Sequence, residues 1–393
     1  MSLNDRVSAE RIHIAFFGLR NAGKSSVVNA VTNQQLSVVS DVKGTTTDPV
    51  KKAMELLPVG PVVIIDTAGI DDDGELGLLR VEKTKQILNK TDIAVLVVDA
   101  QKGKQKEDLK LTEDFRKRDI PYITVFNKSD LVSEKTDLKE NEIYVSAKEN
   151  INIDELKELI GKLSRKEENE KTLLGDIVKK GDTVVLVTPI DSSAPKGRLI
   201  LPQQQTIREL LDAGATVVVT KDTELKESLG KLKTAPELVI TDSQAFKRVS
   251  EIVPEDVPLT SFSILFARYK GELWSAVDGA NELDNSEDGD CILIAEGCTH
   301  HRQCGDIGTE KLPQWIKEYT KKDISFDFTS GTDFPEDLKK YKLVVHCGAC
   351  MLTEREMKTR ISLSAEQEIP VSNYGIIIAK MNGILRRAVE PLK

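Results

Sequence analysis

The chain has 393 residues, enough for two or three domains that each bury a core. Its net charge of −9 argues against a broad nucleic-acid surface, because phosphate binding requires clustered Lys and Arg. No stretch reaches the ~20 consecutive apolar residues of a membrane helix. The N-terminal residues lack the order of charged, apolar and small residues that marks a secretion signal, so we expect a cytoplasmic protein.

The first chemical motif is a phosphate-binding loop between a predicted strand and a predicted helix. Residues 12–17 form a strand-like run, and Gly18-x-x-x-x-Gly23-Lys24-Ser25 follows directly. The glycines let backbone N–H groups turn onto phosphate oxygens, Lys24 brings positive charge to the β and γ phosphates, and Ser25 can ligate Mg²⁺. The residues expected to bind the nucleotide phosphates are Asn21, Ala22, Gly23, Lys24, Ser25 and Ser26.

Further motifs follow predicted strands in the order that a GTPase requires. The carboxylate of Asp66 can hold Mg²⁺ through water, and Gly69 can donate its N–H to the γ phosphate. Asp130 can accept hydrogen bonds from the guanine base, and a later loop offers backbone N–H groups to the base. The residues expected to read guanine are Asn127, Lys128, Asp130, Ser146, Ala147 and Lys148. The chain therefore begins with a P-loop GTPase domain of α/β fold.

A threonine-rich segment between the first two motifs predicts the first switch loop. One of Thr45, Thr46 and Thr47 should reach Mg²⁺ when GTP is bound, and we assign Thr46 to this role. The predicted Mg²⁺ site is then Ser25, Thr46 and Asp66. The residues to which we assign catalysis are Lys24, Thr46, Asp66 and Gly69.

Two further features of the domain are Gly44-Thr45-Thr46 and the apolar Ile70 that follows Asp66-Thr67-Ala68-Gly69. In these features the domain resembles the TrmE and Era group of GTPases. Ile70 stands where Ras-like proteins have a water-orienting Gln, so intrinsic hydrolysis should be slow. In TrmE-like proteins the Asn that matches Asn21 helps to bind potassium, and the resemblance implies the same K⁺ role here. An Asn in a tight turn also has a purely structural explanation. The acidic loop 71–75 is a weaker candidate for a catalytic acid.

A charged run at 165–172 predicts a linker, and three apolar runs of strand length follow it, alternating with helical patterns. Such alternation predicts a parallel sheet with helices on its faces. We therefore expect three domains, the first at 1–170 and two further α/β domains with mainly parallel sheets at 171–262 and 263–393. The middle one shows no catalytic constellation and is assigned to dimerisation. Asp191, after a strand, is expected to cap a turn, with metal binding as the alternative.

All five cysteines lie between residues 291 and 350, namely Cys291, Cys298, Cys304, Cys347 and Cys350. Cys298 follows one predicted strand and Cys347-x-x-Cys350 follows another, and ligands of open α/β sheets lie beyond the carboxyl ends of strands. Three thiolates fit a closed zinc site with His300 or His346 as fourth ligand, or a 4Fe–4S cluster with a weaker fourth ligand. A redox dithiol is a third interpretation, and buried unreactive cysteines are the plainest one.

Together with the GTPase domain, Cys298-x-His300 and His346-Cys347-x-x-Cys350 resemble the HydF family of FeFe-hydrogenase maturation GTPases. The resemblance covers the whole chain, including APKGRLILPQQQTI and NYGIIIAKMNG. It implies that Cys298, Cys347 and Cys350 bind a 4Fe–4S cluster, which makes 263–393 the cluster-binding domain. Asp191, His300 and His346 are candidates for an exchangeable fourth position, and Cys304 lies outside the motif.

The same resemblance implies a scaffold or carrier. A diiron subcluster precursor, assembled with the maturases HydE and HydG, would be held beside the cluster and passed to apo FeFe-hydrogenase. GTP, with Mg²⁺, would bias partner association through the switch loops. We expect a homodimer or higher homo-oligomer, with neither a membrane nor nucleic acid as partner.

The main alternative is a TrmE- or Era-like GTPase in RNA modification or ribosome assembly with a structural zinc site. It fits the first domain equally well. The acidic balance and the lack of a recognisable RNA-binding module argue against it. A redox switch at Cys347 and Cys350 leaves Cys298 and the flanking histidines unexplained.

Overall fold

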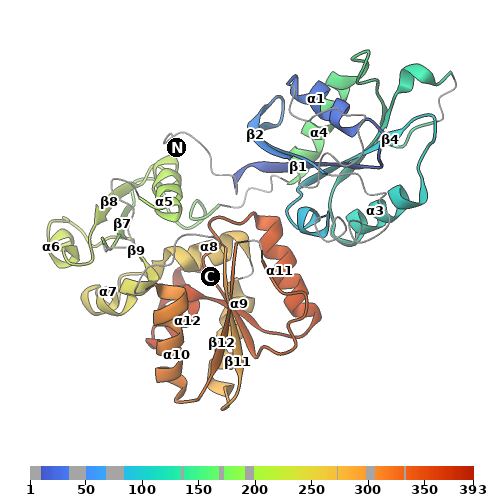
Figure 1. Cartoon of the computed structure of the whole chain (residues 1–393). Coiled ribbons are helices and arrows are strands. Elements are labelled where there is room, and N and C mark those ends of the chain that lie inside the picture. The colour runs from blue at the N-terminus through green and yellow to red at the C-terminus, as the bar shows by residue number, and fades with distance from the viewer. Residues whose placement is uncertain are drawn as a thin grey trace. The chain divides into compact units, whose positions relative to one another are not determined.

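The computed structural model describes residues 10–34, 50–67, 84–133, 137–167, 172–190, 199–271, 273–297, 306–331 and 333–393. The chain divides into two compact units, residues 1–169 and 170–393 (Figure 1). Within these described ranges, no helix combines the length and apolar character needed to cross a membrane.

The first unit is built on a six-stranded sheet in the order β2-β3-β1-β4-β5-β6, in which β2 runs antiparallel to β3 and the other pairs are parallel. The strands are β1 Ile12–Gly18, β2 Val50–Leu56, β3 Gly60–Asp66, β4 Ile93–Asp99, β5 Tyr122–Asn127 and β6 Glu142–Tyr144. The helices are α1 Lys24–Thr32, α3 Lys106–Lys117, α4 Ile153–Glu167 and a short 3₁₀ helix at Ser129–Leu131. Strand β4 is buried along its whole length, as expected where helices cover both faces of a parallel sheet.

Alternate residues of β1 face two helical layers. Ile14 and Phe16 belong to the core under α1 and α4, whereas Ala15 and Phe17 pack on the other face with Phe115 of α3. Figure 1 shows α1 and α4 on one side of this sheet and α3 on the other. Because the parallel strands end at one edge, the loops after β1, β3, β5 and β6 gather there. The predicted P-loop GTPase fold is confirmed.

The second unit contains two four-stranded sheets whose described pairings are all parallel. The first has the order β10-β9-β7-β8 and the second the order β12-β11-β13-β14. Their strands are β7 Thr183–Val187, β8 Thr216–Thr220, β9 Leu238–Thr241, β10 Leu259–Ser261, β11 Cys291–Glu296, β12 Ser325–Ser330, β13 Leu343–His346 and β14 Val371–Asn373. The predicted parallel α/β architecture after the GTPase region is confirmed.

One continuous core joins these two sheets. It contains Val185 of β7, Ile294 of β11 and Leu265 of the helix that follows β10 directly. The helices of this unit are α5 Leu201–Asp212, α6 Leu225–Gly230, α7 Phe246–Ile252, α8 Phe262–Lys270, α9 Leu273–Ala280, α10 Leu312–Thr320, α11 Glu354–Glu366, α12 Tyr374–Met381 and α13 Leu385–Val389. A division of this unit at residue 262 stays a prediction.

Strand β11 separates two helical layers in the second sheet. Ile292 and Ile294 lie in the core with α10 and α12, and Leu293 and Ala295 lie in a second cluster that Leu363 of α11 covers. In Figure 1, α10 and α12 lie on one side of this sheet and α11 on the other. The carboxyl edge of the sheet, where β11 and β13 end, is thus flanked by helices of both layers.

Candidate functional sites

The phosphate loop joins β1 to α1, and two of its glycines are required by the geometry. Gly18 and Gly23 have φ values of 154° and 83°. A Cβ on Gly18 would lie 2.3 Å from the carbonyl oxygen of Val97, and one on Gly23 would lie 2.2 Å from Nδ2 of Asn127. The absence of side chains therefore lets the loop pack directly on β4 and on Asn127. Helix α1 begins at Lys24, so its first N–H groups open toward the loop.

Lys24, Ser25 and Asp66 meet where β3 ends. Ser25 Oγ donates a hydrogen bond of 3.0 Å to Asp66 Oδ2, and Lys24 Nζ lies 3.5 Å from Asp66 Oδ1. Asp66 is 8% exposed, and its Oδ1 accepts no hydrogen bond from the described residues. A hydroxyl beside a carboxylate oxygen with spare acceptor capacity is a donor set that Mg²⁺ prefers. Ser25 and Asp66 therefore fit the cation. The other residues predicted for this site, namely Thr46, Gly69, Ile70 and the acidic loop 71–75, lie outside the described residues.

Asn127 links the phosphate loop to the later guanine loop. Its Nδ2 donates to the carbonyl oxygen of Ala22 at 3.0 Å, and its Oδ1 accepts from the N–H of Ala147 at 3.1 Å. The neighbouring Lys128 donates from Nζ to Asn21 O and Asp99 Oδ2, both at 2.7 Å. The fold therefore brings three of the predicted motifs together through side-chain bonds.

Burial and pairing act in opposite directions on Asp99. Burial disfavours its charge, but the Lys128 ammonium and the Gln101 N–H hold the pKa of Asp99 below its usual value. A hollow of about 270 Å³ opens beside the phosphate loop, next to Arg20, Asp99 and Lys102. Asn21 has a φ of 63°, the left-handed conformation that Asn tolerates better than most residues. A structural reason for Asn at this position therefore exists alongside the predicted K⁺ role.

The remaining guanine-loop residues differ in exposure. Asp130 lies exposed in the 3₁₀ helix after β5, where its carboxylate faces solvent and can meet a base. Ser146 is buried, and its Oγ accepts the N–H of Glu149 at 3.2 Å. Lys148 is exposed and pairs with Glu149 at 3.4 Å. Ser26, which is predicted to bind the phosphates, is half-buried in α1. Asp130 is thus the side chain of this group best placed to contact a ligand.

Cys347 and Cys350 lie in the turn after β13. In the sheet, Ala295 of β11 pairs with His346, and the N–H of Cys347 donates to Ala295 O at 3.0 Å. Cys347 Sγ accepts two backbone N–H groups, from Gly297 at 3.0 Å and from Ala349 at 3.4 Å. Strands β11 and β13 are therefore neighbours, and their ends meet at this sulfur.

Several candidate ligands lie outside the described residues: Asp191, Cys298, His300 and Cys304. Among the residues that are described, no three His, Cys, Asp or Glu side chains cluster as a metal site. Burial raises the pKa of Cys347 to about 11, although the two N–H donors act to lower it. Burial also raises the pKa of Cys350, although the charge of the nearby Lys270 acts to lower it. Because thiols bind metal as thiolates, metal binding here would release protons.

Both ring nitrogens of His346 are hydrogen-bonded. Nε2 lies 2.9 Å from Arg360 Nη1, and Nδ1 lies 3.1 Å from Cys347 O. A guanidinium only donates and a carbonyl only accepts, so Nε2 is the acceptor and Nδ1 carries the proton. Burial, with the charge of Arg360, lowers the pKa of His346 to about 3, so the ring is neutral at pH 7. These bonds favour a structural role for His346 over the predicted alternative of a fourth ligand.

Two buried cations flank the cysteine turn, and sequence reasoning missed both. Lys270 Nζ, at the end of α8, donates to the carbonyl oxygens of the turn. Arg360 Nη2 donates to Gly331 O at 2.6 Å and to Glu356 Oε1 at 3.0 Å. No sequence pattern near Lys270 indicates its contact with the turn. Glu356 and Arg360, by contrast, stand at i,i+4 spacing, which indicates a pair on one helix face.

Three family models match the chain. The Hydrogen maturase F dimerization domain matches residues 173–271, and the Hydrogen maturase F tetramerization domain matches residues 274–391. A third model, named 50S ribosome-binding GTPase, matches residues 13–128. The chain belongs to the hydrogen maturase F family. Its first unit is a P-loop GTPase domain, for which GTP and Mg²⁺ are the corresponding nucleotide and cation.

Individual relatives of this hydrogen maturase F chain are GTPases by name. It is 37% identical over 131 residues to GTPase Der of Kosmotoga olearia, covering 32% of this chain and 29% of that protein. It is 35% identical over 161 residues to the tRNA modification GTPase MnmE of Chromobacterium violaceum, covering 39% and 35%. The chain thus spans about a third of the length of these curated relatives.

Solved structures also resemble part of the chain. A probable GTP-binding protein engB has 24% identity and a TM-score of 0.33, over 39% of this chain and 100% of that one. Era of Aquifex aeolicus bound to GDP.AlF4- has 19% identity and a TM-score of 0.36, over 61% and 97%.

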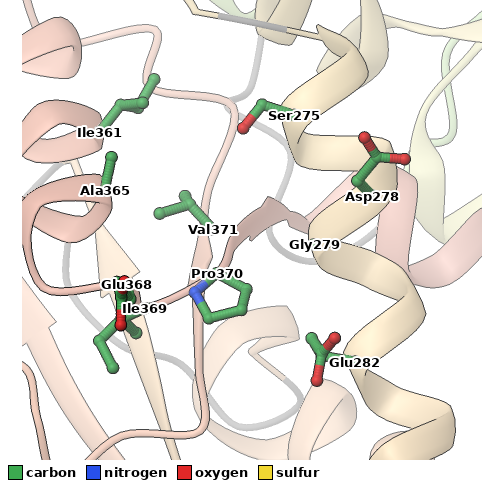
Figure 2. Close-up of a pocket in the computed structure, with 10 residues that line it drawn as sticks. All are labelled: Ser275, Asp278, Gly279, Glu282, Ile361, Ala365, Glu368, Ile369, Pro370 and Val371. Carbon is green, nitrogen blue, oxygen red and sulfur yellow. The ribbon is translucent and has the colours of Figure 1, made fainter.

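A hollow of about 330 Å³ lies at the opposite end of the cysteine-bearing sheet (Figure 2). Figure 2 shows Asp278 on α9 and Glu282, in the 3₁₀ helix Asn281–Asn285 that follows it, at one wall, and Glu368 near β14 at another. Val371, at its edge, pairs with Val344 near the start of β13, whereas the cysteines follow the end of that strand. This hollow is therefore separate from the cysteine turn.

Proposed function

We propose that this hydrogen maturase F chain is a GTP-hydrolysing scaffold that carries a 4Fe–4S cluster and a diiron subcluster precursor, and delivers the precursor to apo FeFe-hydrogenase. The observation that carries the proposal is the turn after β13. There Cys347 Sγ accepts the N–H of Gly297, the residue that directly precedes Cys298. The matches of 173–271 and 274–391 to hydrogen maturase F domains support the same function.

Cys298, Cys347 and Cys350 are the proposed cluster ligands. The donor set fits a 4Fe–4S cluster, because cysteine thiolates are its usual ligands and N–H groups already point at one of the sulfurs. With three thiolates, such a cluster supplies one iron whose remaining ligand is exchangeable. Among the candidates for that place, Asp191 and His300 are preferred to His346, whose two ring nitrogens bond to Arg360 and Cys347. An exchangeable position is the physical requirement for a carrier that releases its cargo.

In the GTPase unit, Ser25, Thr46 and Asp66 are proposed to hold Mg²⁺, and Lys24 to balance phosphate charge. The hydrogen bond from Ser25 to Asp66 and the approach of Lys24 to the same carboxylate support this assignment. Gly69 is proposed to donate its N–H to the γ phosphate.

Hydrolysis is proposed to be slow, because Ile70 cannot orient water, and to be stimulated by K⁺ near Asn21. The bound nucleotide would bias association with HydE, HydG and the hydrogenase through the switch loops. The names of the matched domains, dimerization and tetramerization, support a homo-oligomer. We place the protein in the cytoplasm.

A second candidate is a GTPase in RNA modification or ribosome assembly with a structural zinc site. One observation favours it, namely that curated relatives include tRNA modification GTPases. It gives no role to the hydrogen maturase F domains that match the second unit.

Metal analysis distinguishes the two functions. We expect the chain, purified and reconstituted without oxygen, to contain iron and sulfide and to give an EPR signal after reduction with dithionite. The Cys347→Ala variant should lose this signal. Cys291→Ala is the matched control, because Cys291 is a free, half-buried cysteine at the other end of β11. One equivalent of zinc with no reconstitutable cluster would contradict the carrier function and support the second candidate.

A separate measurement tests the K⁺ role. GTP hydrolysis by the full chain should fall when Na⁺ replaces K⁺ at equal ionic strength. An unchanged rate would remove the role proposed for Asn21 and leave its left-handed conformation as the reason for the residue.

A further inference from the structure

Lys270 ends α8 and is only 4% exposed, although its side chain carries a charge. Its ammonium donates to the carbonyl oxygens of Ala349 at 3.2 Å, Cys350 at 3.3 Å and Leu352 at 2.7 Å. An ammonium has three donors, and three carbonyls of the turn accept from this one. A helix 79–82 residues away in the sequence therefore holds the cysteine turn from one side.

The conformation of the turn needs such support. Ala349 has a φ of 54°, which is unfavourable for a residue with a Cβ. In this conformation the N–H of Ala349 points at Cys347 Sγ while its carbonyl oxygen points at Lys270. The bonds to Lys270 thus stabilise the same backbone arrangement that directs an N–H group at the sulfur.

A neutral side chain would fill this buried position at a lower desolvation cost than an ammonium does. The carbonyl oxygen of Cys350, a proposed cluster ligand, is one of the three that Lys270 contacts, so the cation lies next to the proposed ligand turn.

We propose that Lys270 is a positioning residue of the cluster site, which fixes the turn that presents Cys347 and Cys350 and sets a buried positive charge beside it. The inference rests on the proposed function, since the charge acts on a cluster that these cysteines bind. Thiolate ligands make such a site anionic, and a nearby buried cation stabilises the more negative, reduced state. Lys270 thereby raises the reduction potential of the site and slows the loss of iron.

The test compares the full chain with Lys270→Met, which keeps most of the length of the side chain and removes its charge and donors. Arg268→Met is the matched control, because it removes a cation two residues earlier on α8, where the guanidinium pairs with Asp176 instead of the turn. Three quantities are measured: the midpoint potential in an EPR-monitored redox titration, the rate of iron release to a chelator, and hydrogen exchange of residues 347–352 in the cluster-free chain.

We expect Lys270→Met to lower the midpoint potential and to release iron ~10–100-fold faster, in line with the loss of metal affinity that outer-shell changes typically cause. Hydrogen exchange of the turn should accelerate, and Arg268→Met should match the wild type in all three measurements. If Lys270→Met does not fold, Lys270→Gln keeps hydrogen-bond donors without the charge and should also lower the potential.

A wild-type potential and iron-release rate in either Lys270 variant would overturn the inference, as would an equal change in Arg268→Met. If the wild-type chain binds no cluster, the proposed function fails. The exchange measurement then still decides whether Lys270 fixes the turn, because it requires no metal.

Discussion

The buried ion pair of Arg360 and Glu356 predicts a large change in the stability of the second unit. The two side chains are 5% and 7% exposed, and Nη2 of Arg360 lies 3.0 Å from Oε1 of Glu356. Arg360 also donates to Gly331 and His346, and its guanidinium lies 4.9 Å from the ring centre of Phe334. Replacing Arg360 by Met keeps much of the apolar bulk and leaves the carboxylate of Glu356 buried without this cation.

The expected loss of unfolding free energy in Arg360→Met follows from the burial of this pair. Removing one partner of a buried pair costs about 3–5 kcal/mol of unfolding free energy, because the other charge stays uncompensated. For a unit of ~150–250 residues, each kcal/mol shifts the melting temperature by roughly 2–4 °C, so Tm should fall by roughly 6–20 °C. The double variant Arg360→Met/Glu356→Leu leaves no buried charge at the pair and should recover much of this loss.

Tryptophan fluorescence isolates the measurement, because both tryptophans of the chain, Trp274 and Trp315, belong to the second unit. The matched control is Arg208→Met, which breaks another i,i+4 pair whose side chains are 78% and 58% exposed. Such an exposed pair contributes ~0–1 kcal/mol. The reasoning is refuted if Arg360→Met shifts Tm no more than Arg208→Met does, or if the double variant is no more stable than the single one.

Two further predictions concern other polar contacts. Asn127→Ala leaves the carbonyl of Ala22 and the N–H of Ala147 without their partner, at about 1–3 kcal/mol each. GTP affinity and the melting of the first unit by circular dichroism should fall while the tryptophan-detected transition stays in place; equal shifts in both would contradict the assignment. Asp176→Asn tests a half-exposed pair, in which the hydrogen bond from Arg268 lowers the pKa of Asp176 below 3.8. The folded-state pKa is depressed, so this stability, ~0–1 kcal/mol, is present above that value and lost as pH falls through the folded pKa. The variant should therefore melt below the wild type at pH 7 and together with it near pH 2, and a constant difference would count against the pair.

The GTPase fold could be predicted from sequence because each of its motifs is local. A strand, a loop of fixed spacing and a helix stand next to one another in the chain, and the parallel sheet gathers the loops at one edge. Boundaries were harder to predict. Helix α5 begins at Leu201, because Pro202 is tolerated in a first turn and the side-chain oxygen of Gln203 accepts the N–H of Ile200.

The support of the cysteine turn could not be predicted in the same way. Lys270 meets the turn through contacts between distant segments, and such contacts leave no spacing to recognise. The position of His346 was open to prediction from strand alternation. Val344 and His346 share one face of β13, and Val344 packs in the cluster that α11 covers, so His346 is directed at Arg360 of α11. Its place next to Cys347 in the sequence suggested a ligand instead.

The candidate sites of the two units lie at the carboxyl edges of mainly parallel sheets and are stabilised differently. In the first, glycines and Asn127 shape a loop that leaves N–H groups for a nucleotide. In the second, Lys270 donates hydrogen bonds to carbonyl oxygens of the cysteine turn, and backbone N–H groups point at the sulfur of Cys347. On the proposed function, a carrier must keep its cluster and release its cargo, so rigid support of the cysteines and exchange at a fourth position serve different steps. Loosening the turn at Lys270 should therefore release cluster and cargo together, whereas substitution at the fourth ligand should release the cargo alone.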